Sequence, residues 1–250
     1  MRIKILFYLL SLVILSQAQE DSIACEPIDT THYYQGFFIQ AHVAPFFTHN
    51  LYTRTSINDY TNPINPNSLT TEHPAYLVGV NVGYQTRDWV ALVGLHYSER
   101  TADYKLVEDR EIIVGDDTNV VEVEVNYVNR YQDINIPISF GYLTSFGRWS
   151  LAIKAGVYFS FNIFNDGYTY DFDKKEVIRL EENFAPFLVS YSLNAALKYK
   201  ISNKWKVYAE PYYISGINSM WSSSPIYAWK QIHYGLAVGV EYSIKDLNPR

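Results

Sequence analysis

The sequence predicts an all-β fold: an eight-stranded antiparallel transmembrane β-barrel of the outer-membrane type, with long extracellular loops and short periplasmic turns. Three observations predict it. Apolar residues recur at every second position in eight segments. The connections between these segments alternate between long and short, and aromatic residues stand where strands meet the short turns.

The clearest signal is a hairpin around Gly147. Residues 134–142 and 149–161 each carry an apolar residue at every second position. Such alternation gives a strand one apolar face and one polar face. The connection between the two runs is short and contains a glycine, and Tyr142 and Trp149 stand at this end of the two strands. We therefore expect a tight turn flanked by outward aromatic residues.

The same alternation places the other strands along the chain. The eight predicted strands cover residues 35–47, 75–86, 89–100, 120–142, 148–164, 185–200, 205–216 and 229–244. The long connections are residues 48–74, 101–119, 165–184 and 217–228, which are rich in polar and turn-forming residues. Short turns separate them in strict alternation, so both ends of the barrel chain are expected on the short-turn, periplasmic side.

The fourth predicted strand changes phase along its length. Its upper part has apolar residues at odd positions, whereas residues 134–142 have them at even positions. We expect either a β-bulge near residues 129–132 or an upper portion that stands clear of the membrane. Apolar residues exposed to water usually mark an interaction site. The candidate interaction surface is therefore Val121, Val123, Val125 and Tyr127.

Aromatic residues define the membrane boundary on the short-turn side. This predicted girdle consists of Tyr84, Trp89, Tyr142, Trp149, Tyr199, Trp205 and Tyr242. Trp89 and Tyr97 lie eight residues apart on the outward phase, a rise of roughly 20 Å in a tilted strand, close to the apolar band of such barrels. A soluble barrel would hold its apolar residues inside, whereas here the inward set is polar. The apolar outer face therefore predicts contact with lipid.

The N-terminus carries a predicted secretory signal peptide, residues 1–18. Arg2 and Lys4 precede an apolar run at residues 5–15, and small residues precede the expected cleavage site. The run is too short for a spanning helix, although an N-terminal membrane anchor is the alternative. Residues 19–33 form a flexible periplasmic lead, 34–244 the barrel and 245–250 a polar tail. Export and the barrel together predict an integral protein of the cell outer membrane.

Cys25 is the single cysteine, so no intramolecular disulfide is possible. A free thiol in the lead segment and a lipidated cysteine both remain open.

The composition indicates which partners to expect. Removing the signal peptide leaves 18 basic against 26 acidic residues, a net charge of −8. This balance argues against nucleic acid. The 23 tyrosines and two methionines favour strands and membrane interfaces over helices. The expected partners are outer-membrane lipids (lipopolysaccharide and phospholipid) and other outer-membrane or secretion-system proteins.

Eight strands leave a lumen that side chains fill. The inward phase carries His42, His96, Arg100, Asp133, Lys154, Lys198, Tyr208, Glu210, Tyr212, His233 and Glu241. Because a buried unpaired charge is unfavourable, these charges must pair. Lys154 and Glu210 lie equally far from their girdle tryptophans, which predicts an ion pair across the lumen. The predicted plug residues are Lys154, Glu210, Asp133, Arg100, Lys198 and Glu241.

Three groups of polar residues could form a functional site, but a structural role or a solvent-exposed position explains each of them better. His96 and Ser98 resemble a nucleophile and base, but the strand phase directs both into the lumen, away from lipid. His42, His96 and His233 point inward at staggered heights, whereas a metal site needs ligands converging on one point. The acidic stretch 171–176 lacks the spacing of a calcium loop. We therefore predict no catalytic residue, no metal and no cofactor.

Four segments resemble one known family. They are residues 131–142 (YQDINIPISFGY), 155–158 (AGVY), 209–213 (AEPYY) and 235–242 (GLAVGVEY). These segments are similar to the PorT-like outer-membrane β-barrel family of Bacteroidota, over about residues 35–244. The resemblance implies an eight-stranded barrel and, for some relatives, a part in protein secretion. The polar tail after residue 244 departs from the family pattern.

The predicted function is that of a non-enzymatic outer-membrane barrel with a plugged lumen, acting as a structural, docking or secretion-accessory component through its outer loops. The alternatives are a lipid-modifying barrel enzyme and a narrow pore or small-ligand binder. An enzyme would need polar side chains that lipid can reach, and a pore would need a lumen without bridging charges.

Overall fold

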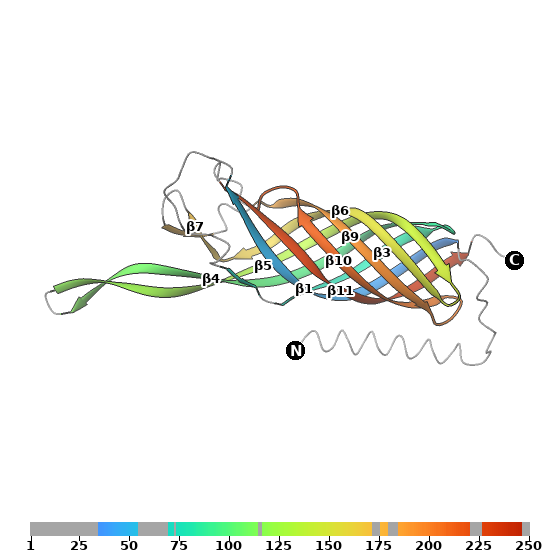
Figure 1. Cartoon of the computed structure of the whole chain (residues 1–250), viewed down its shortest axis with the longest axis horizontal. Coiled ribbons are helices and arrows are strands. Elements are labelled where there is room, and N and C mark those ends of the chain that lie inside the picture. Colours follow the sequence, from blue (N-terminus) through green and yellow to red (C-terminus); the bar gives the residue numbers. More distant parts are fainter. Residues whose placement is uncertain are drawn as a thin grey trace.

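The computed structural model describes residues 35–54, 70–72, 74–114, 117–171, 176–179, 185–220 and 227–246, and these form a closed antiparallel β-barrel (Figure 1). Side chains are described for residues 35–51, 74–101, 128–167, 185–220 and 230–244. The predicted signal peptide, the lead segment and Cys25 lie outside the described residues, as do the last four residues of the tail.

Eight strands build the barrel, as the sequence predicts. They are β1 (Gly36–Arg54), β3 (Ala75–Gln85), β4 (Trp89–Val114), β5 (Asp117–Phe146), β6 (Trp149–Asp166), β9 (Phe187–Lys200), β10 (Trp205–Gly216) and β11 (Tyr227–Asp246). Their order around the barrel is β4-β3-β1-β11-β10-β9-β6-β5, and the pairing of β4 with β5 closes it. Within the described part of the chain, no helix is long and apolar enough to cross a membrane.

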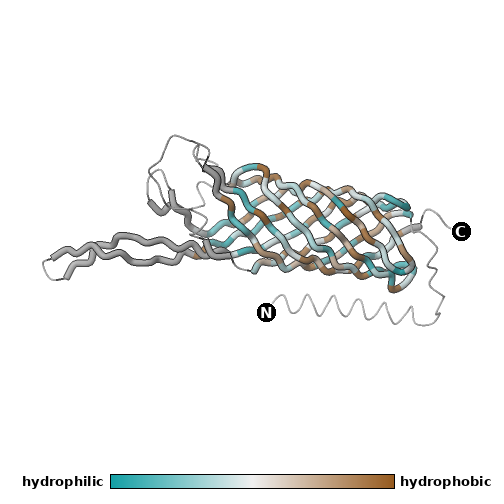
Figure 2. The backbone as a smooth tube through the Cα atoms, in the orientation of Figure 1, coloured by the Kyte–Doolittle hydropathy of each residue, from teal (hydrophilic) through white to brown (hydrophobic). Residues whose placement is uncertain are grey.

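The alternation of residues separates two faces along each strand. In β4, Val93 and Leu95 are 49% and 56% exposed, whereas the neighbouring Leu92 and His96 are 7% and 3% exposed. Figure 2 shows apolar and polar residues alternating around the whole barrel wall. Many of the exposed side chains along the strands are large and apolar, and much of the enclosed set is polar or charged. This distribution is the reverse of that in a soluble barrel and is typical of a membrane-spanning one.

The predicted girdle forms a ring of cross-strand aromatic pairs on the tight-turn side. Each pair consists of residues directly opposite one another, with ring centroids about 5–6 Å apart: Trp89–Tyr142, Trp149–Tyr199, Trp205–Tyr242 and Phe37–Tyr84. Directly opposed aromatic residues stabilise a strand pair beyond their burial. Phe37, which the sequence analysis did not include, completes the ring so that all eight strands contribute one aromatic residue.

The tight turn at Gly147 agrees with the prediction. Gly147 has φ of 65°, a left-handed conformation that other residues adopt only at a cost. This turn joins β5 to β6 directly after the Phe146–Trp149 pair.

The predicted second loop, residues 101–119, is wrong. β4 continues to Val114 and β5 begins at Asp117, and the two strands pair without a break from Trp89↔Tyr142 to Val114↔Asp117. The acidic composition suggested a loop, but the two antiparallel segments continue the ladder already established in the barrel wall. Figure 1 shows the resulting hairpin extending past the end of the barrel.

The β-bulge predicted in the fourth strand lies instead in its neighbour. The unbroken β4–β5 register excludes an extra residue in β5 at that height. The pairing of β5 with β6 shifts between Gln132 and Asp133, which face Phe164 and Asn162 and leave Ile163 as the additional residue. The predicted upper portion is present as the β4–β5 extension, because the backbone of residues 121–127 belongs to β5.

Two other predicted loops, residues 48–74 and 165–184, also contain strand segments. β1 continues to Arg54, beyond the predicted end at residue 47, along β11. A short strand, β2 (Thr70–Glu72), pairs with β4 at residues 102–104. In the acidic third loop, β7 (Tyr168–Asp171) and β8 (Glu176–Arg179) form a small separate hairpin.

We predict that a charge in the middle of the outer band destabilises the inserted barrel. Val93 lies midway between Trp89 and Tyr97, so Val93→Arg is expected to cost about 2–4 kcal/mol because the guanidinium meets hydrocarbon. Denaturant unfolding in lipid vesicles measures this. Ile201→Arg in the exposed turn beyond the girdle is the control, with an expected effect of about 0–1 kcal/mol. Equal effects at the two positions would contradict a lipid-facing band.

Candidate functional site

The lumen is the site where the sequence placed the charged residues, and it holds them in stacked groups. Nearest the girdle, Glu241 of β11 contacts two lysines, Lys198 of β9 and Lys206 of β10, the latter at 2.7 Å. The Nε2 of Gln40 also donates to Glu241 Oε2 at 2.8 Å. Lys198 Nζ lies 4.9 Å from the centroid of the Phe38 ring. One fully buried carboxylate is therefore surrounded by three donors.

A second group lies further along the barrel. Lys154 Nζ of β6 donates to Glu210 Oε2 of β10 at 2.8 Å, and Asn194 Nδ2 donates to the other carboxylate oxygen at 3.0 Å. The predicted pair is thus present, but it is not a contact across the barrel diameter. It bridges two strands over β9, the strand that carries Asn194 and lies between them.

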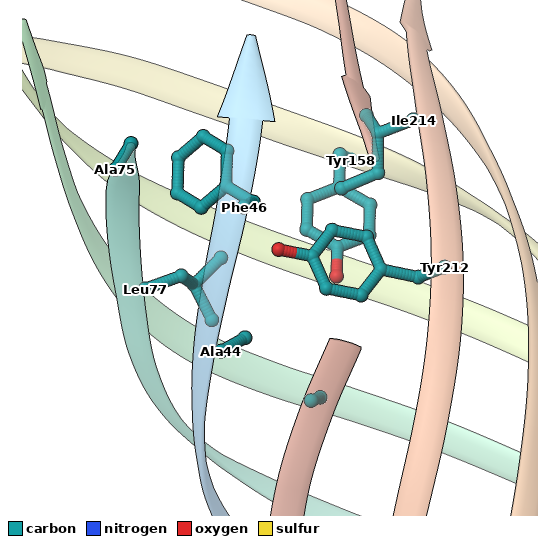
Figure 3. Packing of buried hydrophobic residues seen from close by; sticks show 8 residues of the cluster. Ala44, Phe46, Ala75, Leu77, Tyr158, Tyr212 and Ile214 are labelled. Carbon is teal, nitrogen blue, oxygen red and sulfur yellow. The ribbon is translucent and has the colours of Figure 1, made fainter. Parts of the chain in front are cut away.

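An apolar layer follows the second group. Figure 3 shows side chains from β1, β3, β6 and β10 pointing into the barrel toward one another. The cluster consists of Ala44, Phe46, Ala75, Leu77, Tyr158, Tyr212, Ile214 and Ala237. Small cavities of about 20 Å³ and 40 Å³ lie on its girdle side and its loop side, and Leu77, Tyr158 and Tyr212 line both. The layer therefore separates two polar parts of the lumen.

The third charged group lies on the loop side of this layer. Arg100 Nη2 of β4 is 3.1 Å from Asp133 Oδ2 of β5, and Asn162 Nδ2 donates to the other oxygen of Asp133 at 2.8 Å. Arg100 Nη1 lies 3.2 Å from His233 Nε2, whose other ring nitrogen is 3.0 Å from Thr48 Oγ1. All six predicted plug residues are thus present as three ion pairs.

Several lumen residues were missed by the sequence analysis. Gln40 and Asn81 connect the group around Glu241 to His96. Asn81 Nδ2 donates to Gln40 Oε1, and Asn81 Oδ1 lies 2.8 Å from His96 Nε2. Lys206 and Asn194 complete the shells around the two glutamates. The strand alternation already directs these residues inward, as Lys206 shares the phase of Tyr208 and Glu210. Attention to charged pairs alone overlooked the neutral amides.

His96 and Ser98 are both buried in the lumen, as the strand phase predicts. Each bonds an asparagine rather than the other: Ser98 Oγ accepts from Asn135 Nδ2 at 3.0 Å, and His96 contacts Asn81. Neither of these hydrogen bonds joins His96 to Ser98.

The three histidines are not equally spaced. His42 and His96 are in edge contact with ring centroids 4.6 Å apart, so the expectation that all three are staggered is wrong for this pair. Both residues lie directly opposite Gly79 of β3, the strand between β1 and β4, which places their rings at the same height. His233 lies apart, with Arg100 and Thr48. Among the described residues, no group of three or more histidine, cysteine or acidic side chains could hold a metal ion.

A polar cluster also stands on the outer surface of the barrel near its loop end. Glu99 accepts hydrogen bonds from Tyr76, Tyr97, Arg130 and Gln132, at 2.8–3.3 Å. Arg130 is half exposed, and its guanidinium carbon lies 5.9 Å from the centroid of the Phe164 ring. The sequence does not predict this cluster, because its members come from three strands and meet only through the register of β3, β4 and β5.

Two sequence predictions fall outside the described side chains. Val121, Val123, Val125 and Tyr127 lie on β5, whose backbone is described there but whose side chains are not. The acidic stretch 171–176 spans the ends of β7 and β8, with residues 172–175 outside the described part.

Comparison with known proteins yields no family. No family model and no curated protein matches the chain. Solved structures resemble it at low identity: OprG from Pseudomonas aeruginosa (10% identity, TM-score 0.48, 86% of this chain and 99% of that chain) and Neisserial surface protein A (10%, 0.43, 85% and 100%). The outer membrane protease OmpT from Escherichia coli is similar (12%, 0.42, 88% and 100%). At these values the likeness concerns barrel shape alone.

We predict that removing one charge of the Lys154–Glu210 pair lowers the free energy of unfolding more than removing both charges. Lys154→Met leaves Glu210 buried with Asn194 as its remaining donor, and we expect a loss of about 3–5 kcal/mol in unfolding free energy. The double variant Lys154→Met with Glu210→Leu removes both charges and should lose less than the single variant. Denaturant unfolding in vesicles measures the difference. Purely additive losses would show that the two charges do not interact.

Proposed function

We propose that this protein is a non-enzymatic integral barrel of the cell outer membrane, exported by a cleaved signal peptide. In this proposal it acts as a structural, docking or secretion-accessory component. The lumen is plugged, the girdle faces the periplasm, and the opposite end carries the surface that meets other proteins. Outer-membrane lipids surround the wall.

The observation that carries this proposal is the β4–β5 extension. Beyond Arg100 of β4, the two strands form 14 residue pairs, from Thr101↔Arg130 to Val114↔Asp117. At about 3.3 Å per residue this is roughly 45 Å of paired chain. A barrel that served only as a membrane anchor would need none of it. The extension lies at the loop end, opposite the girdle (Figure 1).

A two-stranded ribbon has two open edges, which supports docking. Of the described strands, only β2 pairs with the outer edge of β4 here, at residues 102–104. Backbone N–H and C=O groups at such edges pair readily with a strand from another chain. We propose that the extension, which includes Val121, Val123, Val125 and Tyr127, is where an outer-membrane or secretion-system protein binds.

The lumen supports a plugged barrel rather than a pore. Three charged groups and an apolar layer fill it. The cavities on either side of the layer are about 20 and 40 Å³, which is room for a few water molecules. An ion would have to cross the layer of Tyr158, Tyr212 and Leu77 without its hydration shell.

The alternative of a lipid-modifying enzyme would have to use polar groups that lipid can reach. The Glu99 cluster is such a group, but its carboxylate already accepts from four side chains, and no serine, cysteine or histidine belongs to the cluster. This favours the non-enzymatic proposal. Mass spectrometry of outer-membrane lipids from cells with and without Glu99→Gln provides the check, with an unchanged lipid pattern expected.

Membership of the PorT-like family of Bacteroidota is part of the same proposal. It rests on the four quoted sequence segments, which contribute lumen residues Asp133, Tyr158, Glu210 and Glu241 to the three charged groups and the apolar layer. Identifying the binding partners by affinity purification would test whether a secretion component is among them.

We predict that shortening the extension removes protein partners while the barrel still inserts. Ala102 and Asn129 are opposite one another, so residues 103–128 can be replaced by a two-residue Asn-Gly turn. Crosslinking in native membranes followed by mass spectrometry measures the partners. The matched control replaces residues 172–175 between Asp171 and Glu176 of β7 and β8 with the same turn. An unchanged partner set after the first deletion would contradict the proposal.

We predict that the apolar layer controls ion passage. The wild-type monomer in planar bilayers is expected to show no steady conductance. Tyr158→Ala combined with Tyr212→Ala should introduce one, because both rings leave the layer between the two cavities. Steady current through the wild-type monomer would contradict a plugged lumen.

A further inference from the structure

The loop-side cavity of the lumen has features that a plug alone does not explain. Its volume is about 40 Å³, and Arg100, Asp133, Tyr212, Gln231 and His233 are among its lining residues. A buried water needs roughly 10–15 Å³, so the cavity has room for about three or four non-hydrogen atoms. Its walls come from all eight barrel strands, so its shape is set by the closed barrel.

Hydrogen-bond donors in this cavity lack partners. Arg100 and Tyr212 are 6% and 9% exposed. The Nε and Nη2 atoms of Arg100 and the hydroxyl of Tyr212 make no hydrogen bond. Asp133 Oδ2 lies 3.1 Å from Nη2 and balances its charge, but without hydrogen-bond geometry. Buried donors of this kind are unfavourable unless something accepts from them.

The polar atoms without hydrogen-bond partners indicate which kind of ligand would fit the cavity. Three donor atoms stand against one unpartnered acceptor, Gln231 Oε1. The Nε and Nη2 atoms form one edge of the guanidinium, and that edge matches the two oxygens of a carboxylate. Tyr212, whose hydroxyl is the remaining donor, is one of the residues that line the same cavity.

We propose that the loop-side cavity binds a small monocarboxylate of the size of formate or acetate. The Nε–Nη2 edge of Arg100 donates to the two carboxylate oxygens, and the Tyr212 hydroxyl provides a third hydrogen bond. Asp133 is held by Asn162 Nδ2 at 2.8 Å and keeps the arginine in place. This site is independent of the docking surface on the extension.

The experiment measures binding of ¹³C-labelled acetate and formate to the full-length protein in lipid nanodiscs by NMR, at constant ionic strength. Saturable binding is expected for the wild type. Tyr212→Phe removes one hydroxyl and should weaken binding roughly two- to tenfold. Arg100→Gln should abolish it.

The matched control is Tyr208→Phe, which removes another buried hydroxyl in the lower lumen, 3.2 Å from His42 Nδ1. Its affinity should equal that of the wild type. If Arg100→Gln fails to fold, the comparison of the two tyrosine variants decides. Absence of saturable binding to the wild type would mean that the cavity holds water only. Equal weakening by Tyr208→Phe and Tyr212→Phe would also overturn the proposal.

Discussion

The pairing of charges inside a closed eight-stranded wall is the constraint on which the rest of this structure depends. Such a wall encloses a space that side chains fill, so a charged residue on the inward phase has little water to solvate it. Each of the three buried carboxylates therefore lies against a basic group and at least one amide nitrogen or second lysine. A buried charged residue on one strand therefore requires an oppositely charged residue on a nearby strand.

These pairs also determine how the barrel strands are tied together. Lys154–Glu210 and Lys198–Glu241 each join strands that are not adjacent, across the strand between them. The backbone ladder connects only neighbouring strands, so the side-chain pairs add a second level of connection. The apolar layer around Tyr158 and Tyr212 interrupts this polar column. The lumen is therefore divided into two separate polar compartments.

The two ends of the barrel meet different physical demands. At the tight-turn end, opposed aromatic pairs surround the wall and the chain reverses within a few residues. At the other end, β4 and β5 extend beyond the barrel and keep the same pairing register over residues 101–114 and 117–130. The Glu99 cluster marks the outer surface where the apolar band gives way to polar groups. The proposed docking surface lies at this second end.

The sequence by itself determined the strand count, the girdle and the inward set, because a period of two leaves each residue only one of two faces. It did not determine where the strand pairing ends. The acidic composition of residues 101–119 is typical of a loop, and only the pairing of β4 with β5 shows that both strands continue there. Nor did it place Phe37, Gln40 or Lys206 in their groups. Those contacts depend on register between strands far apart in the chain, which only the closed barrel decides.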